Sequence, residues 1–286
     1  MIGLYIILAA SFDLVLGHGG LVSIAHPIFA ALGAYVSALI SMHFGIPIAL
    51  SIILGAVFAA IASIGLALPS LRVSGDYLLI ASIGFQLGIL HVIKNVEFTG
   101  GPSGLSDIPS LIDGTSRSPA YLLIVVVVTA AVVWLIRRIV RGDYGRALTG
   151  MRDDEIALAA LGRNSMKIKL TTFALGSGLA GLSGALYAHY FLYVTPEQFE
   201  ITESAAILTM VVVGGLRSTW GPVMGALLIV ALPESIKFLD LPPAVNAPLQ
   251  GLFYTGLVMF FLFARPQGVV GRQTAPMPLR QTYSRG

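Results

Sequence analysis

Residues 120–136 read AYLLIVVVVTAAVVWLI and contain no charged side chain. At about 1.5 Å of rise per residue, a helix of this length nearly crosses the hydrocarbon core of a bilayer. Arg137, Arg138 and Arg141 follow directly, and basic residues collect at the cytoplasmic ends of membrane helices. This stretch therefore predicts a transmembrane helix that ends in the cytoplasm.

Similar apolar runs occupy most of the remaining chain. Regular runs cover residues 46–68, 77–93, 171–194 and 249–264, and shorter runs broken by glycine or proline cover 2–17, 23–42, 205–216 and 219–232. The 286 residues are 56% hydrophobic and only 11% charged, whereas a soluble domain carries about 25% charged residues. A water-soluble globule is therefore excluded. The sequence predicts an all-α polytopic membrane protein with about eight or nine hydrophobic segments, some of them short or broken.

The distribution of lysine and arginine predicts the sidedness of these segments. Most of the basic residues lie in the stretches 137–169 and 265–286, which we therefore expect to be cytoplasmic. The predicted organisation is a transmembrane domain at 1–264, with a cytoplasmic loop at 137–169, followed by a basic cytoplasmic tail at 265–286.

A group of acidic residues is predicted on the extracytoplasmic side. Glu197, Glu200 and Glu203 have no basic neighbour in the sequence, and the order of the apolar runs puts them outside, together with the loop at 94–119. The same order puts the N-terminus outside, so we expect a further helix ahead of Met1.

Two glycine-glycine segments resemble each other at a constant offset. The matching residues are Gly19, Gly20, Leu21, Ser23, Pro27, Ala31 and Leu32 in the first, and Gly214, Gly215, Leu216, Ser218, Pro222, Ala226 and Leu227 in the second. Paired broken helices of this kind mark the translocation site in transporters, where freed amides can face an anionic group. We therefore expect these glycines and Ser218 to lie on a translocation path within an internal repeat. The alternative is two tight turns between ordinary helices.

The polar stretch 137–169 contains one short helical pattern. Arg152, Asp153, Asp154 and Glu155 precede an apolar segment that ends before Gly162, so the acids match the helix dipole at the start and glycine follows at the end. A helix of this length is unstable alone in water. It must dock, either in the groove of a partner or on its own membrane domain.

Asp13 is the acid that lies well inside an apolar run. An intramembrane carboxylate is by default a functional residue, although Asp13 could instead lie at the interface beside His18. The histidines are scattered without metal-site spacing, and we expect lone membrane histidines to be hydrogen-bonded helix contacts. No Gly-Lys pair occurs, and hence no GxxxxGK phosphate loop, so any ATP must be bound by another subunit.

Several motifs together are similar to one family. They are Leu71-Arg72-x-x-Gly75-Asp76-Tyr77, Thr99-Gly100-Gly101-Pro102-x-Gly104-Leu105, Gly145-Arg146-Ala147-Leu148 with Gly162-Arg163-Asn164, and Gly214-Gly215-Leu216-x-Ser218-x-x-Gly221-Pro222. In this order they resemble the LivM-type permeases of bacterial branched-chain amino acid ABC importers. The resemblance runs from about Ser11 to Glu234.

This resemblance implies a role for the short loop helix. In the family, a similar helix couples the permease to an ATPase. The implied coupling residues are Arg152, Asp153, Asp154, Glu155, Ala159, Ala160 and Gly162.

The resemblance also implies the partners. They are a LivH-type sister permease, two ABC ATPase subunits that bind the ATP, and an extracytoplasmic solute-binding protein. The complex is expected in the bacterial inner membrane. The chain itself is expected to bind no cofactor, metal or nucleic acid. The implied cargo is leucine, isoleucine or valine.

Two departures from the family pattern affect the choice of cargo. The family tends to have asparagine where this chain has Asp13, and an acid near the position of Gln86. Both residues are candidates for the solute path. Urea and short amides are the closest alternative cargoes, and a self-contained ion-coupled secondary transporter is the alternative mechanism. An intramembrane enzyme is weaker, because paired carboxylates and cysteine are absent from the apolar runs.

Overall fold

The computed structural model describes residues 1–70, 76–112, 117–237, 255–256, 259–260 and 268–270. The helices of this part of the chain are α1 (Ile2–Asp13), the π-helical turn η1 (Leu14–His18), α2 (His26–Phe44), α3 (Ile48–Ser70), α4 (Asp76–Asn95), the 3-10 turns η2 (Glu97–Thr99) and η3 (Gly101–Ser103), α5 (Arg117–Arg141), α6 (Asp143–Asp153), α7 (Glu155–Ala160), α8 (Ser165–Phe191), the 3-10 turn η4 (Pro196–Phe199), α9 (Ile201–Gly214) and α10 (Gly221–Lys237).

The predicted all-α architecture is confirmed. Eight of the nine predicted hydrophobic segments coincide with helices, and the ninth, at 249–264, lies largely outside the described residues. By length and composition, α2, α3, α4 and α5 each contain a stretch apolar enough to cross a membrane. The apolar helices α1 with η1, α9 and α10 are shorter. The predicted tail at 265–286 is described only at residues 268–270.

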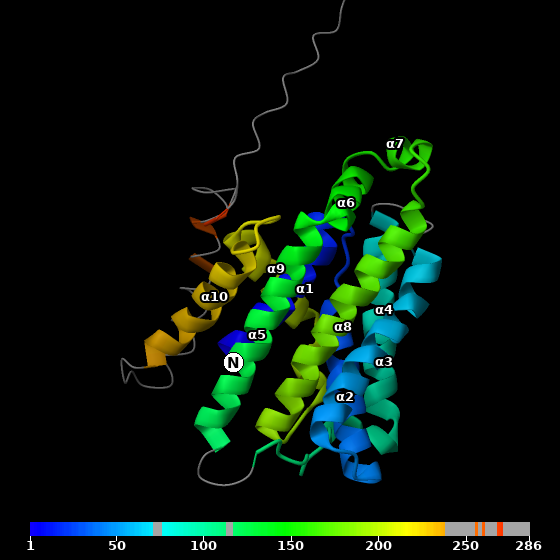
Figure 1. Cartoon of the computed structure of the whole chain (residues 1–286). Helices are drawn as coiled ribbons and strands as arrows, with labels where there is room; N and C mark the ends of the chain where they lie inside the picture. The colour runs from blue at the N-terminus through cyan, green and yellow to red at the C-terminus, as the bar shows by residue number, and fades with distance from the viewer. Residues whose placement is uncertain (71–75, 113–116, 238–254, 257–258, 261–267, 271–286) are drawn as a thin grey trace, which may run out of the picture.

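Three helices pack closely against one another through small residues and form a framework. α2, α3 and α8 pack against one another along their length (Figure 1). A side chain added at Gly33 of α2 would collide with the backbone of Gly181 in α8, and one added at Gly184 would collide with the carbonyl of Ala30. Backbones can approach this closely only where glycine removes the Cβ atom. Gly181 and Gly184 of α8 therefore form a packing surface within the chain.

Buried histidines hold this framework together through side-chain hydrogen bonds. His26 Nε2 of α2 lies 2.8 Å from Ser11 Oγ of α1. His189 Nε2 of α8 lies 2.9 Å from Ser37 Oγ of α2, and its Nδ1 lies 2.8 Å from the carbonyl oxygen of Pro109. The expectation that these histidines are helix contacts is thus confirmed for both residues.

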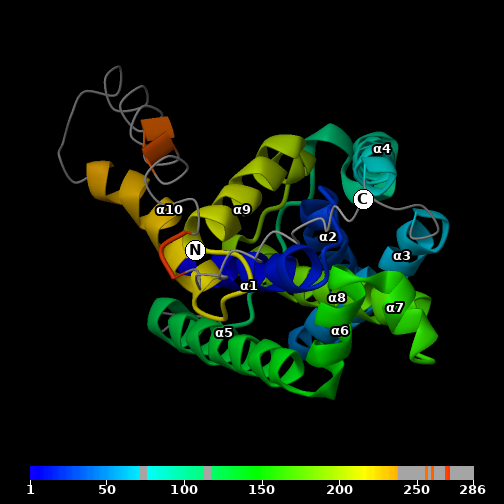
Figure 2. The same ribbon diagram turned by 90° about the horizontal axis from the view of Figure 1, so that it is seen from above.

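α1 occupies the centre of the molecule. It contacts α8, α10, α5 and α9, which surround it when the bundle is seen from above (Figure 2). Its last residues continue into η1, which ends near α6 at the end of the bundle that carries α6 and α7 (Figure 1). After η1 the chain leaves the helix at Gly19–Gly20 and enters α2 only at His26.

The two glycine-glycine segments are structurally similar. Each is followed, at equal spacing, by a helix with proline in its first turn, which is Pro27 in α2 and Pro222 in α10. Proline suits this position because the first helical turn needs no amide donor from it. Both segments lie at the same end of the bundle, because the Arg217 amide beside the second donates to Asp13 beside the first.

At the other end, the loops after α4 and α8 meet. Leu105 and Val194 exchange backbone hydrogen bonds of 2.9 and 3.0 Å. Lys94 Nζ at the end of α4 lies 2.9 Å from Glu200 Oε1. The fold therefore brings a lysine from a distant helix to Glu200, which has no basic neighbour in the sequence.

Candidate functional site

The helical pattern of the loop at 137–169 is divided between two helices. Arg152 and Asp153 end α6, and the chain turns at Asp154, whose extended backbone (φ −157°, ψ 101°) separates α6 from α7. The predicted helix start at Arg152 is therefore wrong by about one turn. The Asp154 carboxylate caps α7 by accepting the Ala157 amide at 2.9 Å, and this bond favours a new start over continuation of α6.

α7 is attached to the bundle by one ion pair and one apolar side chain. Glu155 Oε2 lies 2.7 Å from Lys169 Nζ of α8, and Leu158 is buried. Gly162 follows the helix in the left-handed region, at φ +77°. Ile156 and Leu161, in contrast, are 83% and 80% exposed. These two side chains are available for the docking contact that the sequence predicts for this short helix. Ala159 and Ala160 are also exposed.

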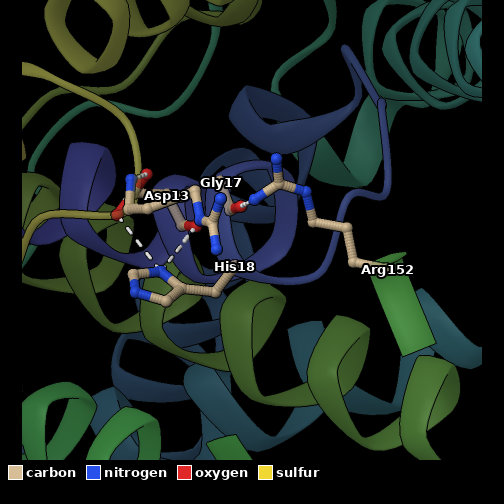
Figure 3. Close-up of polar contacts among 5 residues, drawn as sticks. Asp13, Gly17, His18 and Arg152 are labelled. Atoms are coloured by element: carbon tan, nitrogen blue, oxygen red, sulfur yellow. Dashed lines mark hydrogen bonds and ion pairs between the residues drawn. The ribbon is translucent and has the colours of Figure 1, made fainter. Parts of the chain in front are cut away.

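Arg152 connects this loop to the broken end of the first helix. Its Nη1 donates to the carbonyl oxygen of Gly17 in η1 at 2.8 Å (Figure 3). Gly20 (φ +66°) lies directly against the aliphatic part of the Arg152 side chain, where an added Cβ would be 2.7 Å from Cγ. Glycine is therefore required at position 20 for both its backbone conformation and its close approach.

Asp13 lies on the other side of η1 and is 2% exposed. Its Oδ1 accepts the backbone amide of Arg217 at 3.0 Å, and its Oδ2 lies 3.3 Å from Nδ1 of His18 (Figure 3). A buried carboxylate needs such partners, because an isolated one is strongly disfavoured away from water. Asp13 is therefore buried, contacts His18 and connects the two glycine-glycine segments, while its role on a solute path stays a prediction.

The charges around η1 form a compact cluster. Burial and the neighbouring Arg217 guanidinium lower the pKa of Arg152, while the carboxylates of Asp153 and Asp13 act in the opposite direction. Arginine remains charged at neutral pH all the same. Two guanidinium groups and a buried carboxylate therefore meet where α6, η1 and the loop after α9 come together.

A short segment of the predicted tail reaches the same place. The amides of Val269 and Val270 donate to the carbonyl oxygens of Val213 and Gly214 at 2.9 and 3.1 Å. Gly268 packs against Gly215. The end of α9 is therefore covered by residues from a distant part of the chain.

Gln86 lies elsewhere, in a buried hydrogen-bond network. Its Nε2 donates to the carbonyl oxygen of Phe199 at 3.1 Å, and its Oε1 accepts the Ser204 hydroxyl at 3.1 Å. Gln86 is fully buried and joins α4, η4 and the start of α9. It thus supports one wall of the bundle and does not approach Asp13.

The structure therefore brings most of the predicted path residues into one cluster at the α6 end, which comprises Asp13, Gly19, Gly20, Gly214 and Gly215, with Ser218 in the adjoining loop. Sequence reasoning missed Gly17, Lys169 and Arg217. Arg217 directly precedes Ser218 inside the second glycine-glycine motif. Its position in this motif could have indicated that it belongs to the site.

Comparison of the sequence with known proteins identifies the family of this chain. The family model described as "Branched-chain amino acid transport system / permease component" matches residues 1–262. The chain belongs to the branched-chain amino acid permease family. Members of this family are membrane transport subunits, and the resemblance found in the motifs is confirmed.

Individual permeases of the family are similar along nearly the whole chain. LivM of Escherichia coli K12, a high-affinity branched-chain amino acid transport permease, is 30% identical over 99% of this chain and 71% of its own length. A probable LivM of Methanocaldococcus jannaschii is 25% identical over 96% of this chain and 93% of its own. LivH of E. coli K12 is 24% identical over 94% of this chain and 91% of its own. No solved structure matches the chain.

Proposed function

We propose that this protein is a transmembrane permease subunit of an ATP-driven importer, and that it translocates branched-chain amino acids across the bacterial inner membrane beside a LivH-like sister permease. The support for the cargo is the similarity to permeases named for branched-chain amino acids over nearly the full chain. In this proposal, two separate ATPase subunits bind the ATP, and an extracytoplasmic binding protein delivers the solute.

The contact between Arg152 and Gly17 carries the mechanism. α7 presents Ile156 and Leu161 to an ATPase, while α6, directly before it, holds the π-helical turn of α1 through this hydrogen bond. Movement of the docked α6–α7 segment is thereby transmitted to the break between α1 and α2. A π-helical turn is a weak point in a helix and is suited to a change of conformation.

The experiment reconstitutes the permease with its ATPases, sister permease and binding protein. Replacing Ile156 and Leu161 by aspartate should abolish ATPase association. Arg152→Ala should leave association intact and reduce leucine-stimulated ATP hydrolysis by about fivefold, because a partly exposed bond from a charged donor is worth about 1 kcal/mol. Arg146→Ala is the matched control, since Arg146 pairs with Asp143 at the exposed surface of the same helix.

Two results would refute the proposal. The coupling assignment fails if leucine stimulates ATP hydrolysis equally in the Arg152→Ala and Arg146→Ala variants. The proposal as a whole fails if the purified chain transports leucine without nucleotide, because this result is expected of a secondary transporter.

A further inference from the structure

A second feature of the bundle is a cavity of about 160 Å³ between the starts of α1, α2 and α9 and the C-terminal third of α8. Its volume is about five times the share of one water molecule in the liquid, so it can hold one small solute. The wall is mainly aliphatic and aromatic and includes Leu4, Leu8, Ala30 and Ile207. This composition suits a branched hydrocarbon side chain.

Glu203 places a carboxyl group in the wall of this apolar cavity. It lines the cavity from the first turn of α9 and is only partly exposed. The Tyr5 hydroxyl of α1 interacts with its carboxylate, and Tyr187 of α8 lies in the same wall. Among the described residues, the ion pairs formed by lysine, arginine and histidine do not include Glu203.

The rest of the wall positions Glu203. Ser204, the next residue, donates to Gln86, and Gln86 in turn holds the carbonyl of Phe199, which also lines the cavity. A carboxylate that is held in a half-buried apolar site without a basic side chain is a favourable partner for an ammonium group, because a charge-assisted hydrogen bond is strongest where water is scarce.

We propose that this cavity binds the transported α-amino acid, with Glu203 accepting the ammonium group and the aliphatic wall contacting the branched side chain. The inference rests on the proposed transport function. It gives Glu203 the role of a specificity residue, because an apolar solute without an ammonium group leaves the carboxylate unpaired in the cavity.

The first test measures leucine uptake by the reconstituted transporter at leucine concentrations well below saturation, where the loss of a binding contact lowers the rate directly. Glu203→Gln should reduce the uptake rate by at least about tenfold, the usual effect of losing a charge-assisted bond. Glu197→Gln removes the same charge from an exposed site nearby and should transport like the wild type. The inference is overturned if both variants transport within twofold of each other. If the wild type shows no nucleotide-dependent uptake, the proposed function itself fails.

The second test does not depend on the activity of Glu203→Gln. The chain contains no cysteine, so a single Leu8→Cys variant places the one thiol in the cavity wall. Leucine should slow the modification of this thiol by a methanethiosulfonate reagent, whereas 4-methylpentanoate, which lacks the ammonium group, should not. Leu16→Cys, two turns further along the same helical segment, should show no protection by either compound.

Each other outcome of the labelling experiment counts against the inference. Equal protection by leucine and 4-methylpentanoate would mean that the cavity binds hydrocarbon without recognising the ammonium group. Absence of protection at Leu8→Cys would mean that the cavity is not the binding site.

Discussion

Gly55→Ala tests the close packing that positions the whole site. Gly55 is buried in α3, and a Cβ atom there would lie 2.5 Å from the carbonyl oxygen of Gly33 in α2. This is about 0.9 Å closer than the 3.4 Å at which ordinary contact begins. Because the obstructing atom belongs to the backbone, it cannot rotate away, and α2 and α3 must separate.

The magnitude follows from two opposing effects. Overpacking of this kind costs about 1–3 kcal/mol. Alanine recovers at most about 1 kcal/mol through its greater helix propensity. With the middle of the overpacking range, about 2 kcal/mol, the free energy of unfolding should fall by about 1–2 kcal/mol, and the melting temperature by about 2–8 °C at about 2–4 °C per kcal/mol.

The assay is thermal unfolding of the purified protein in detergent, with Gly65→Ala as the control. Gly65 lies in the same helix, but an added Cβ there would meet no atom within 4 Å. Gly65→Ala should therefore match or exceed the wild-type melting temperature. The packing argument is refuted if Gly55→Ala is as stable as Gly65→Ala.

Two further substitutions test the contacts around the site. Gln86→Leu removes the donor to Phe199 and the acceptor of Ser204, and the melting temperature should fall because the unpaired buried groups cost about 1–3 kcal/mol each. Lys169→Met removes the ion pair with Glu155, and amide hydrogen exchange in α7 should become about fivefold faster, since a partly exposed pair is worth up to about 1 kcal/mol.

Conservative variants serve as controls for these two predictions. Gln86→Asn keeps an amide donor and an amide acceptor and should unfold at a higher temperature than Gln86→Leu. Lys167 is exposed two residues before Lys169, so Lys167→Met should leave exchange in α7 unchanged. An equal effect at the two lysines, or wild-type stability of Gln86→Leu, would contradict the assigned contacts.

The sequence by itself determined the fold class and most of the helices. Uncharged runs such as 120–136 must form helices in a bilayer, because every backbone amide there needs a partner within its own segment. The local signals around α7 were also readable, since Asp154 and Gly162 act on the backbone next to them. The motifs from Leu71 to Pro222, taken together and in order, were sufficient to indicate the family.

Only the tertiary structure decided which residues meet. The contacts of Arg152 with Gly17, of Asp13 with Arg217, and of Glu203 with the cavity join segments that are far apart in the chain. Periodicity and composition describe the immediate neighbours of a residue, and they carry no information about which distant helix packs against it. These contacts depend on the close approach of backbones at glycine, and that approach is fixed by the packing of the whole bundle.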